Sequence, residues 1–377
     1  MTPTLHPIFF RSHGRRAAAL VAAGLVVLLA ACGGGGGSAG SSNPPVATPV
    51  AALAAADLAV LIAEGDATSE AIGLAYQQAR GIPEAQMIRI AVPRGSDTIS
   101  ASAFATLKAT LDARLPAGVQ ATLITWTQPS RVVGSCSMSI TSAMAFGYDA
   151  AYCATECRFT RASGYFDSAS SKPFTDLRIR PSMMLGASTL TQAQAIIARG
   201  VAADGSWTGG RGSGQAVLIR TSDATRSVRF NDFQVLAGTS YPRLSTRYID
   251  NSGGAALDFV TGQTGLMFYF TGLVTVPQIA SNSYLPGAVA DHSTSLGGYL
   301  PDGLGQMPAT QWLQAGATAS YGTVEEPCNY TEKFPQASVL VRRYQRGETL
   351  IEAYWKSVQW PGQGLFLGEP LARPWGP

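Results

Sequence analysis

The feature that most constrains the fold of this chain is a regular alternation of apolar runs with helix-like segments. The apolar runs read as strands buried on both faces, and they occupy residues 57–64, 88–92 and 121–126. The segments between them read as helices, at residues 69–80 and 101–115. Strands that alternate with helices in this way predict an α/β fold with a mainly parallel sheet and helices on both faces.

The same alternation resumes after residue 190. Further helices are expected at residues 191–203, 228–236, 309–315 and 337–358. Further strands are expected at residues 215–221, 245–249, 266–270, 288–291, 317–322 and 364–367. Residues 53–377 are therefore expected to form a single α/β domain.

Residues 128–181 interrupt the alternation. This segment contains three cysteines and many serines and threonines, and its aromatic residues include Tyr148, Tyr152, Tyr165 and Phe166. We interpret it as a Cys/Tyr-rich, disulfide-tied insertion at the end of a strand. Loops at the carboxyl ends of parallel strands commonly form the binding sites of α/β proteins, so the insertion is a candidate part of one.

The first 31 residues are organised like a secretory signal peptide. Three arginines, at positions 11, 15 and 16, precede a fifteen-residue uncharged run from Ala17 to Ala31. A membrane span would need about 18 or more apolar residues, which makes a retained anchor helix the weaker interpretation. Leu29-Ala30-Ala31-Cys32 resembles the bacterial lipobox, which predicts lipid modification of Cys32 and thereby a membrane anchor.

Residues 32–52, rich in Gly, Ser and Pro, are expected to form a flexible tether between that anchor and the domain. The chain is thus predicted to be exported and lipid-anchored in the bacterial cell envelope. Gly33, rather than Asp, follows Cys32, and by resemblance to enterobacterial sorting rules this favours the outer membrane, facing the periplasm or the surface.

The net charge of +3 gives no case for nucleic acid as a partner. Three of the 27 basic residues lie in the signal peptide, which leaves 24 basic against 24 acidic residues in the rest of the chain. Nucleic-acid binding would need a basic patch or stripe. The expected partners are the membrane, through Cys32, and an unidentified protein or small-molecule ligand.

Four cysteines follow Cys32, and in an oxidising compartment an even number favours disulfides. They are Cys136, Cys153, Cys157 and Cys328, and they allow three pairings. A bond between Cys153 and Cys157 would be awkward if the two lie one turn apart on a helix. Zinc is less suitable, because His292 is the only histidine after the signal peptide.

No cofactor is expected either. Residues 209–214 are glycine-rich, but they precede a strand and lack the Gly-Lys-Ser/Thr end of a phosphate-binding loop.

Most of the polar residues that could carry chemistry lie between Thr271 and Glu326, and Cys328 follows two residues later. Cys328 could act as a nucleophile with His292 as its base and Asp291 or Glu325 orienting the imidazole. Alternatively, Cys328 closes a disulfide with the insertion and His292 is a hydrogen-bonded loop residue. A third possibility is acid–base work by Asp291 with Glu325 or Glu326.

The predicted topology also suggests where a ligand would bind. The loops after Trp126, Phe270, Ala290 and Gly322 would leave one edge of a parallel sheet. That edge would bring a set of side chains together with the insertion in one cleft: Arg131, Asp291, His292 and Glu325. The alternative is that the insertion merely covers this edge.

Several runs of the chain resemble an uncharacterised family of exported bacterial proteins, found sporadically and usually once per genome. These runs are residues 75–83, 180–185, 285–292, 316–328 and 352–358, and the resemblance extends over residues 57–375. It implies no particular activity.

The second half also has a distant similarity to gingipain-like cysteine peptidases of the caspase clan. Their strands end in Thr-Gly-His-Gly and at the nucleophilic cysteine, whereas here Leu273 follows Thr271-Gly272, and Ala290-Asp291-His292 stands at the cysteine position. The similarity therefore implies a caspase/gingipain-like (flavodoxin-like) architecture without the peptidase dyad. The expected function is a binding or structural domain of the envelope, with a hydrolase as the alternative.

Overall fold

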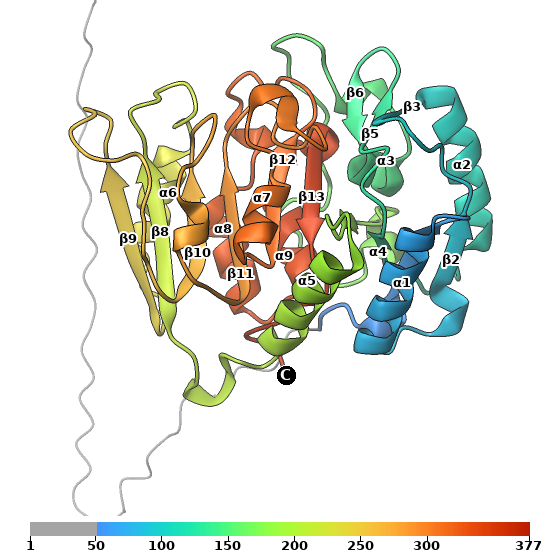
Figure 1. Ribbon diagram of the computed structural model, residues 1–377, viewed down its shortest axis with the longest axis horizontal. Helices are drawn as coiled ribbons and strands as arrows, with labels where there is room; N and C mark the ends of the chain where they lie inside the picture. Colours follow the sequence, from blue (N-terminus) through green and yellow to red (C-terminus); the bar gives the residue numbers. More distant parts are fainter. Residues whose placement is uncertain (1–50) are drawn as a thin grey trace, which may run out of the picture. The chain divides into compact units, whose positions relative to one another are not determined.

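The computed structural model describes residues 51–377, which form an α/β domain around one large sheet (Figure 1). Its strands are β1 (Leu58–Ala63), β2 (Met87–Ile90), β4 (Ala121–Ile124), β7 (Ser182–Met184), β8 (Gly214–Arg220), β9 (Leu244–Asp250), β10 (Leu266–Thr271), β11 (Tyr284–His292), β12 (Ala319–Thr323) and β13 (Gly364–Gly368). They are ordered β2-β1-β4-β7-β13-β12-β11-β10-β8-β9. The signal peptide, Cys32 and nearly all of the tether lie outside the described residues.

The sheet is mainly parallel, as the alternating sequence predicted. β2, β1, β4 and β7 run parallel to one another, and so do β12, β11, β10, β8 and β9. β13 lies between these two groups, antiparallel to β12, and meets β7 through the single pair Leu367 and Met184. In the inner part of the sheet, β1, β4, β7, β10, β12 and β13 are buried along their whole length, which explains why these strands are largely apolar rather than alternating; the edge strand β9 is mostly exposed or partly buried.

Helices cover both faces of the sheet, which confirms the predicted fold class (Figure 1). On one face, α1 (Ala67–Arg80) packs against α5 (Leu190–Ala203), and Arg199 of α5 donates to the Leu313 carbonyl of α7 (Thr310–Ala315). On the other face, α8 (Ala337–Gln345) packs against both α6 (Phe230–Ala237) and α9 (Leu350–Trp355). A further helix, α2 (Ala101–Arg114), contacts β2 at one end of the sheet.

The long helix expected at residues 337–358 is in fact two helices, α8 and α9. Gly347 has a left-handed backbone, with φ of 86°, and breaks the helix. Thr349 then begins α9 through a capping box with Glu352, whose carboxylate also accepts the backbone N–H of Leu53 at 3.0 Å. Leu53 is buried, so this residue is already part of the packed domain.

The segment 128–181 is more than a covering loop. It carries a helix of the core, α3 (Ile140–Phe146), in which all residues but the last are buried. It also contributes β5 (Arg131–Val133) and β6 (Ser137–Ser139) to a small sheet with β3 (Thr98–Ser100). The segment therefore contains the connection between β4 and β7. Within residues 51–377, no helix has the length and apolar character of a membrane span.

Candidate functional site

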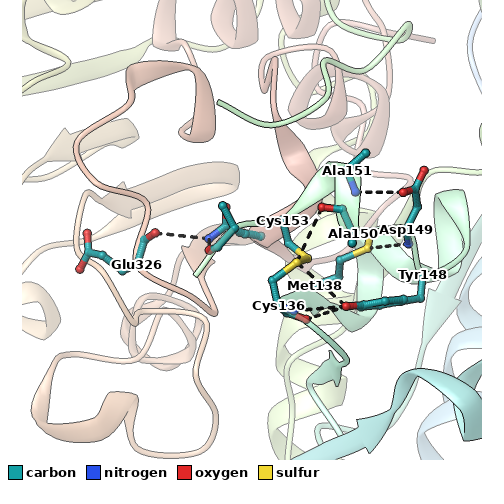
Figure 2. The surroundings of a disulfide bond; sticks show 10 residues. Cys136, Met138, Tyr148, Asp149, Ala150, Ala151, Cys153 and Glu326 are labelled. Atoms are coloured by element: carbon teal, nitrogen blue, oxygen red, sulfur yellow. Dashed lines mark hydrogen bonds between the residues drawn. A yellow bond between two sulfur atoms is a disulfide. The ribbon is translucent and has the colours of Figure 1, made fainter. Parts of the chain in front are cut away.

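Two disulfides involve all four cysteines of the described chain. Cys136 bonds to Cys153 within the insertion, where Tyr148 and Ala150 lie beside the sulfurs (Figure 2). Cys157 bonds to Cys328, which joins the insertion to the loop after β12 across 171 residues of sequence. The structure thus confirms the predicted disulfides and selects one of the three pairings. Cys328 has no free thiol in this state.

A cleft of about 330 Å³ opens where β8, β11 and β12 end. Its lining comes from the loops after these strands, from the insertion and from the segment before α8: Thr225, Arg226, Val228, Ser293, Thr294, Ser295, Glu326, Pro327, Cys328, Asn329, Cys157 and Phe334. The carboxyl ends of parallel strands are the usual position of ligand sites in open α/β sheets. The Cys157–Cys328 disulfide forms part of the wall.

Arg226 is the main basic group of the cleft. Its Nη1 pairs with Asp223 at 2.9 Å, and its Nε donates to Thr294 Oγ1 at 3.3 Å. Its side chain is 23% exposed, so the guanidinium is held in place but still meets solvent. On the opposite wall, Glu326 accepts the backbone N–H of Cys328 at 2.8 Å. The cleft thus offers a positioned cation, a carboxylate and several hydroxyl groups.

A buried ion pair lies beneath this cleft. Arg229 Nη2 donates to Asp291 Oδ1 at 2.6 Å and to the Thr271 carbonyl at 3.0 Å, while Arg229 Nε donates to Ser293 Oγ at 2.7 Å. Tyr354 donates to the other Asp291 oxygen at 3.1 Å. Burial raises the pKa of Asp291, and Arg229 opposes that shift. Arg229 therefore links the end of β11, at Asp291, to the end of β10, at Thr271, and Asp291 is closed to solvent.

His292 points to the opposite face of the sheet from Asp291, because successive strand residues alternate. It is 2% exposed, and its Nδ1 accepts the Trp312 Nε1–H at 2.9 Å. Burial lowers its pKa to about 3, and the nearby positive charges of Arg229 and Arg226 add to this effect. The imidazole is therefore neutral, with its proton on Nε2.

Arg131 lies at the same edge of the sheet as the cleft. Its Nη2 donates to Asp97 at 2.8 Å and to the Tyr299 hydroxyl at 2.5 Å, and its guanidinium stacks on the Tyr299 ring at 3.9 Å. Asp97 follows β2, Arg131 follows β4 and Tyr299 follows β11. These contacts therefore bring the loops after the three strands together.

The four residues expected to share the cleft are Arg131, Asp291, His292 and Glu325. No hydrogen bond or ion pair found in residues 51–377 joins any two of them, and none lines the cleft. Their sequence neighbours Ser293 and Glu326 do line it.

No family model, curated protein or solved structure matches this chain.

β10 and β11 are adjacent and parallel, with Thr271 in register with His292. Leu273 lies two residues beyond the end of β10, and His292 is the last residue of β11. Among residues 51–377, no group of three or more His, Cys, Asp or Glu side chains could hold a metal ion.

The sequence reasoning did not identify Arg226 or Lys333. Arg226 lies five residues after the predicted strand 215–221, and Arg131 likewise lies five residues after the predicted strand 121–126. The position of Arg226 after a strand was therefore a signal that could have identified it. Lys333 is fully buried, and its ammonium has no hydrogen-bond partner in the structure. Burial lowers the pKa of Lys333 to about 8, against the opposing effect of Glu326 and Glu325. Nothing in the sequence indicated that burial.

Proposed function

We propose that this chain is an exported, lipid-anchored protein of the bacterial cell envelope whose α/β domain binds a ligand in the cleft beside Arg226, without peptidase activity. The observation that carries the proposal is the state of the two candidate catalytic residues. Cys328 is bonded to Cys157, and the Nδ1 of the buried His292 accepts a hydrogen bond from Trp312. A cysteine–histidine mechanism requires a thiolate close to an accessible imidazole.

Two features support the proposed location. The sequence up to Cys32 has the form of a lipoprotein signal peptide. The domain has two disulfides, which persist in exported proteins and are rare in the cytosol. A lipid at Cys32, followed by the Gly/Ser/Pro-rich tether, would hold the domain near the membrane surface.

The cleft itself indicates the kind of ligand. Arg226 can donate from its guanidinium, and Ser295 and Asn329 add a hydroxyl and an amide, while Glu326 can accept. Such a lining is suited to a polar ligand with several hydrogen-bonding groups. We further propose that the architecture is caspase/gingipain-like, with Leu273 and His292 in place of the peptidase dyad.

Thiol alkylation tests the proposed lack of peptidase chemistry. Full-length protein, purified from membranes in detergent, would be treated with iodoacetamide under native, non-reducing conditions and mapped by mass spectrometry. We expect no label at Cys328 and no hydrolysis of casein. Labelling of Cys328 together with casein hydrolysis that His292→Asn abolishes would establish the hydrolase instead.

Thermal unfolding tests the proposed binding. Fractions of a cell-envelope extract would be screened for one that raises the Tm of the wild-type protein. We expect Arg226→Gln to abolish this increase. Arg211→Gln is the matched control, because Arg211 is exposed and lies outside the cleft lining. An increase that survives in Arg226→Gln, or the lack of one with every fraction, would contradict binding in this cleft.

A further inference from the structure

Three aromatic rings form a cluster beside the cleft. Phe159, Tyr330 and Trp360 lie with ring centroids 5.3 to 5.5 Å apart in all three pairs. Phe159 is 77% exposed. All other aromatic side chains in residues 51–377 are buried or partly buried. Single exposed apolar residues are normal on protein surfaces, but an exposed ring held against two others is a more specific arrangement.

The cluster is tied to the Cys157–Cys328 disulfide. Phe159 follows Cys157 by two residues, and Tyr330 follows Cys328 by two residues. The Tyr330 hydroxyl also donates to the Cys157 carbonyl at 3.3 Å. The exposed ring of Phe159 therefore lies on a backbone that the disulfide holds in place. Binding of a ligand to this ring would cost less conformational entropy than binding to a ring on a flexible loop.

Polar hollows adjoin this aromatic cluster. The cleft beside Arg226 includes both Cys157 and Cys328 in its wall. A second hollow, of about 310 Å³, is lined by Phe159 itself together with Arg158, Ser135 and Thr155. An exposed ring with hydrogen-bonding surfaces nearby matches a ligand that is apolar on one face and polar around its rim.

The charges around the cluster are balanced. Arg158 lies 3.7 Å from Glu156, Arg226 pairs with Asp223 at 2.9 Å, and Glu326 and Glu325 both act on Lys333. Because each of these groups has a group of opposite charge nearby, even though Glu325 and Glu326 share Lys333, the site is suited to a neutral ligand and less to an anion or a cation.

We propose that the Phe159–Tyr330–Trp360 cluster is a stacking platform for a neutral oligosaccharide built of β-linked, glucose-type pyranose rings. The ring substituents of such a sugar are equatorial, so its faces carry only C–H groups that can stack on an aromatic ring. Its hydroxyls project sideways, toward groups such as Asn329 and Arg158. This inference rests on the proposed binding function and names the ligand class.

A protein partner fits the surface less well. A stable protein interface buries about 800 Å² on each side around an apolar core, whereas the apolar surface here centres on one exposed ring with charged and hydroxyl groups nearby.

Calorimetric titration of the full-length protein in detergent with cellotetraose and with tri-N-acetylchitotriose tests this proposal. We expect at least one of the two to bind, and Phe159→Ala to weaken that binding about tenfold or more. Phe159 is exposed, so the variant should fold. Leu257→Ala is the matched control, because Leu257 is 63% exposed and outside the cluster, and its affinity should equal that of the wild type.

Several results would overturn the platform. One is that neither oligosaccharide binds, and another is that Phe159→Ala binds as tightly as the wild type. If neither sugar binds and an envelope protein co-purifies with the wild type but not with Phe159→Ala, the cluster is a contact site for a protein. The wider proposal of ligand binding fails separately, when the envelope extract gives no shift in Tm that depends on Arg226.

Discussion

The buried His292 should make the stability of the domain depend on pH in a narrow and predictable range. An unfolded chain protonates this histidine with a pKa near 6.5, whereas in the folded protein burial lowers the pKa to about 3. Between these two values the unfolded state binds a proton that the folded state does not bind. The free energy of unfolding therefore falls as the pH decreases below about 6.5, and the contribution is constant above it.

The size of this effect follows from the two pKa values. A difference of one pKa unit corresponds to about 1.4 kcal/mol, so lowering the pH from 7 to 5 should cost about 2 kcal/mol through His292 alone. His292 is the only histidine in residues 51–377, so no second imidazole in the domain complicates the measurement. Asp97 and Asp167 have lowered pKa values, and their protonation affects stability only at more acidic pH.

Urea unfolding of the wild type and of His292→Asn at pH 7, 6 and 5, with the disulfides intact, measures the effect. The asparagine oxygen can still accept from Trp312, although the variant should be less stable at pH 7 because it fills less of the site. Burial raises the pKa values of Asp291 and Glu352, which stabilises the fold as the pH falls, but both proteins share that contribution.

We therefore compare the loss of stability between pH 7 and pH 5 in the two proteins. The wild type should lose about 2 kcal/mol more than His292→Asn over this range. Equal losses in the two proteins would show that His292 protonates as readily in the fold as in the unfolded chain. The account of a neutral imidazole held by burial and by Trp312 would then be wrong.

Two further predictions concern the anchor and the buried ion pair. Cys32→Ala should leave the protein without acylation and unprocessed by lipoprotein signal peptidase; palmitate labelling and the size of the product measure this, and a labelled variant would contradict the lipobox interpretation. Asp291→Ala should lower the free energy of unfolding by about 3–5 kcal/mol, because it leaves Arg229 buried without its partner. Glu70→Ala, which removes an exposed pair with Arg89, should cost under about 1 kcal/mol in the same urea titration. Similar losses in these two variants would refute the argument from burial.

The pattern of strands and helices could be predicted from the sequence because most strands have a clear run of apolar residues. Strands buried on both faces require continuous apolar runs, and β1 and β10 show this clearly. The sequence predicted one helix at residues 337–358, but it also contained local signals that divide this segment into two helices. Gly347 and the Thr349–Glu352 capping box are local signals for an end and a new beginning, but the helical periodicity on either side obscured them.

The buried helix α3 was not predictable in the same way. Its sequence reads as a polar segment, with Ser139 at its start and Thr141 and Ser142 in its first turn. In the fold these hydroxyls donate to carbonyls of the segment that leads into β13, including that of Gly364. A side chain that is polar in sequence can be fully buried when a distant strand supplies its partner, and no local pattern reveals that strand.

For the site, the sequence could predict the edge of the sheet but not the residues that line it. Asp291 and His292 were selected because they end a strand, yet β11 continues through both and buries them on its two faces. The residue of this strand end that lines the cleft is Ser293, the next along the chain, and after β12 it is Glu326 rather than Glu325. A shift of one or two residues at a strand end, the normal uncertainty of such boundaries, decides which side chain meets a ligand.

The position of β13 has a consequence for how the domain can fold. This strand comes last along the sheet-forming chain, yet it sits between β7 and β12, so it alone connects the two groups of parallel strands. Until residues 364–368 are available, β7 and β12 would each present an unpaired edge, which is a template for association with other chains. A nascent chain can build parts of each group but cannot join them, and contacts between such distant segments form slowly. Completion of the core therefore waits until residues 364–368 have been synthesised, and the chain remains incompletely folded until then.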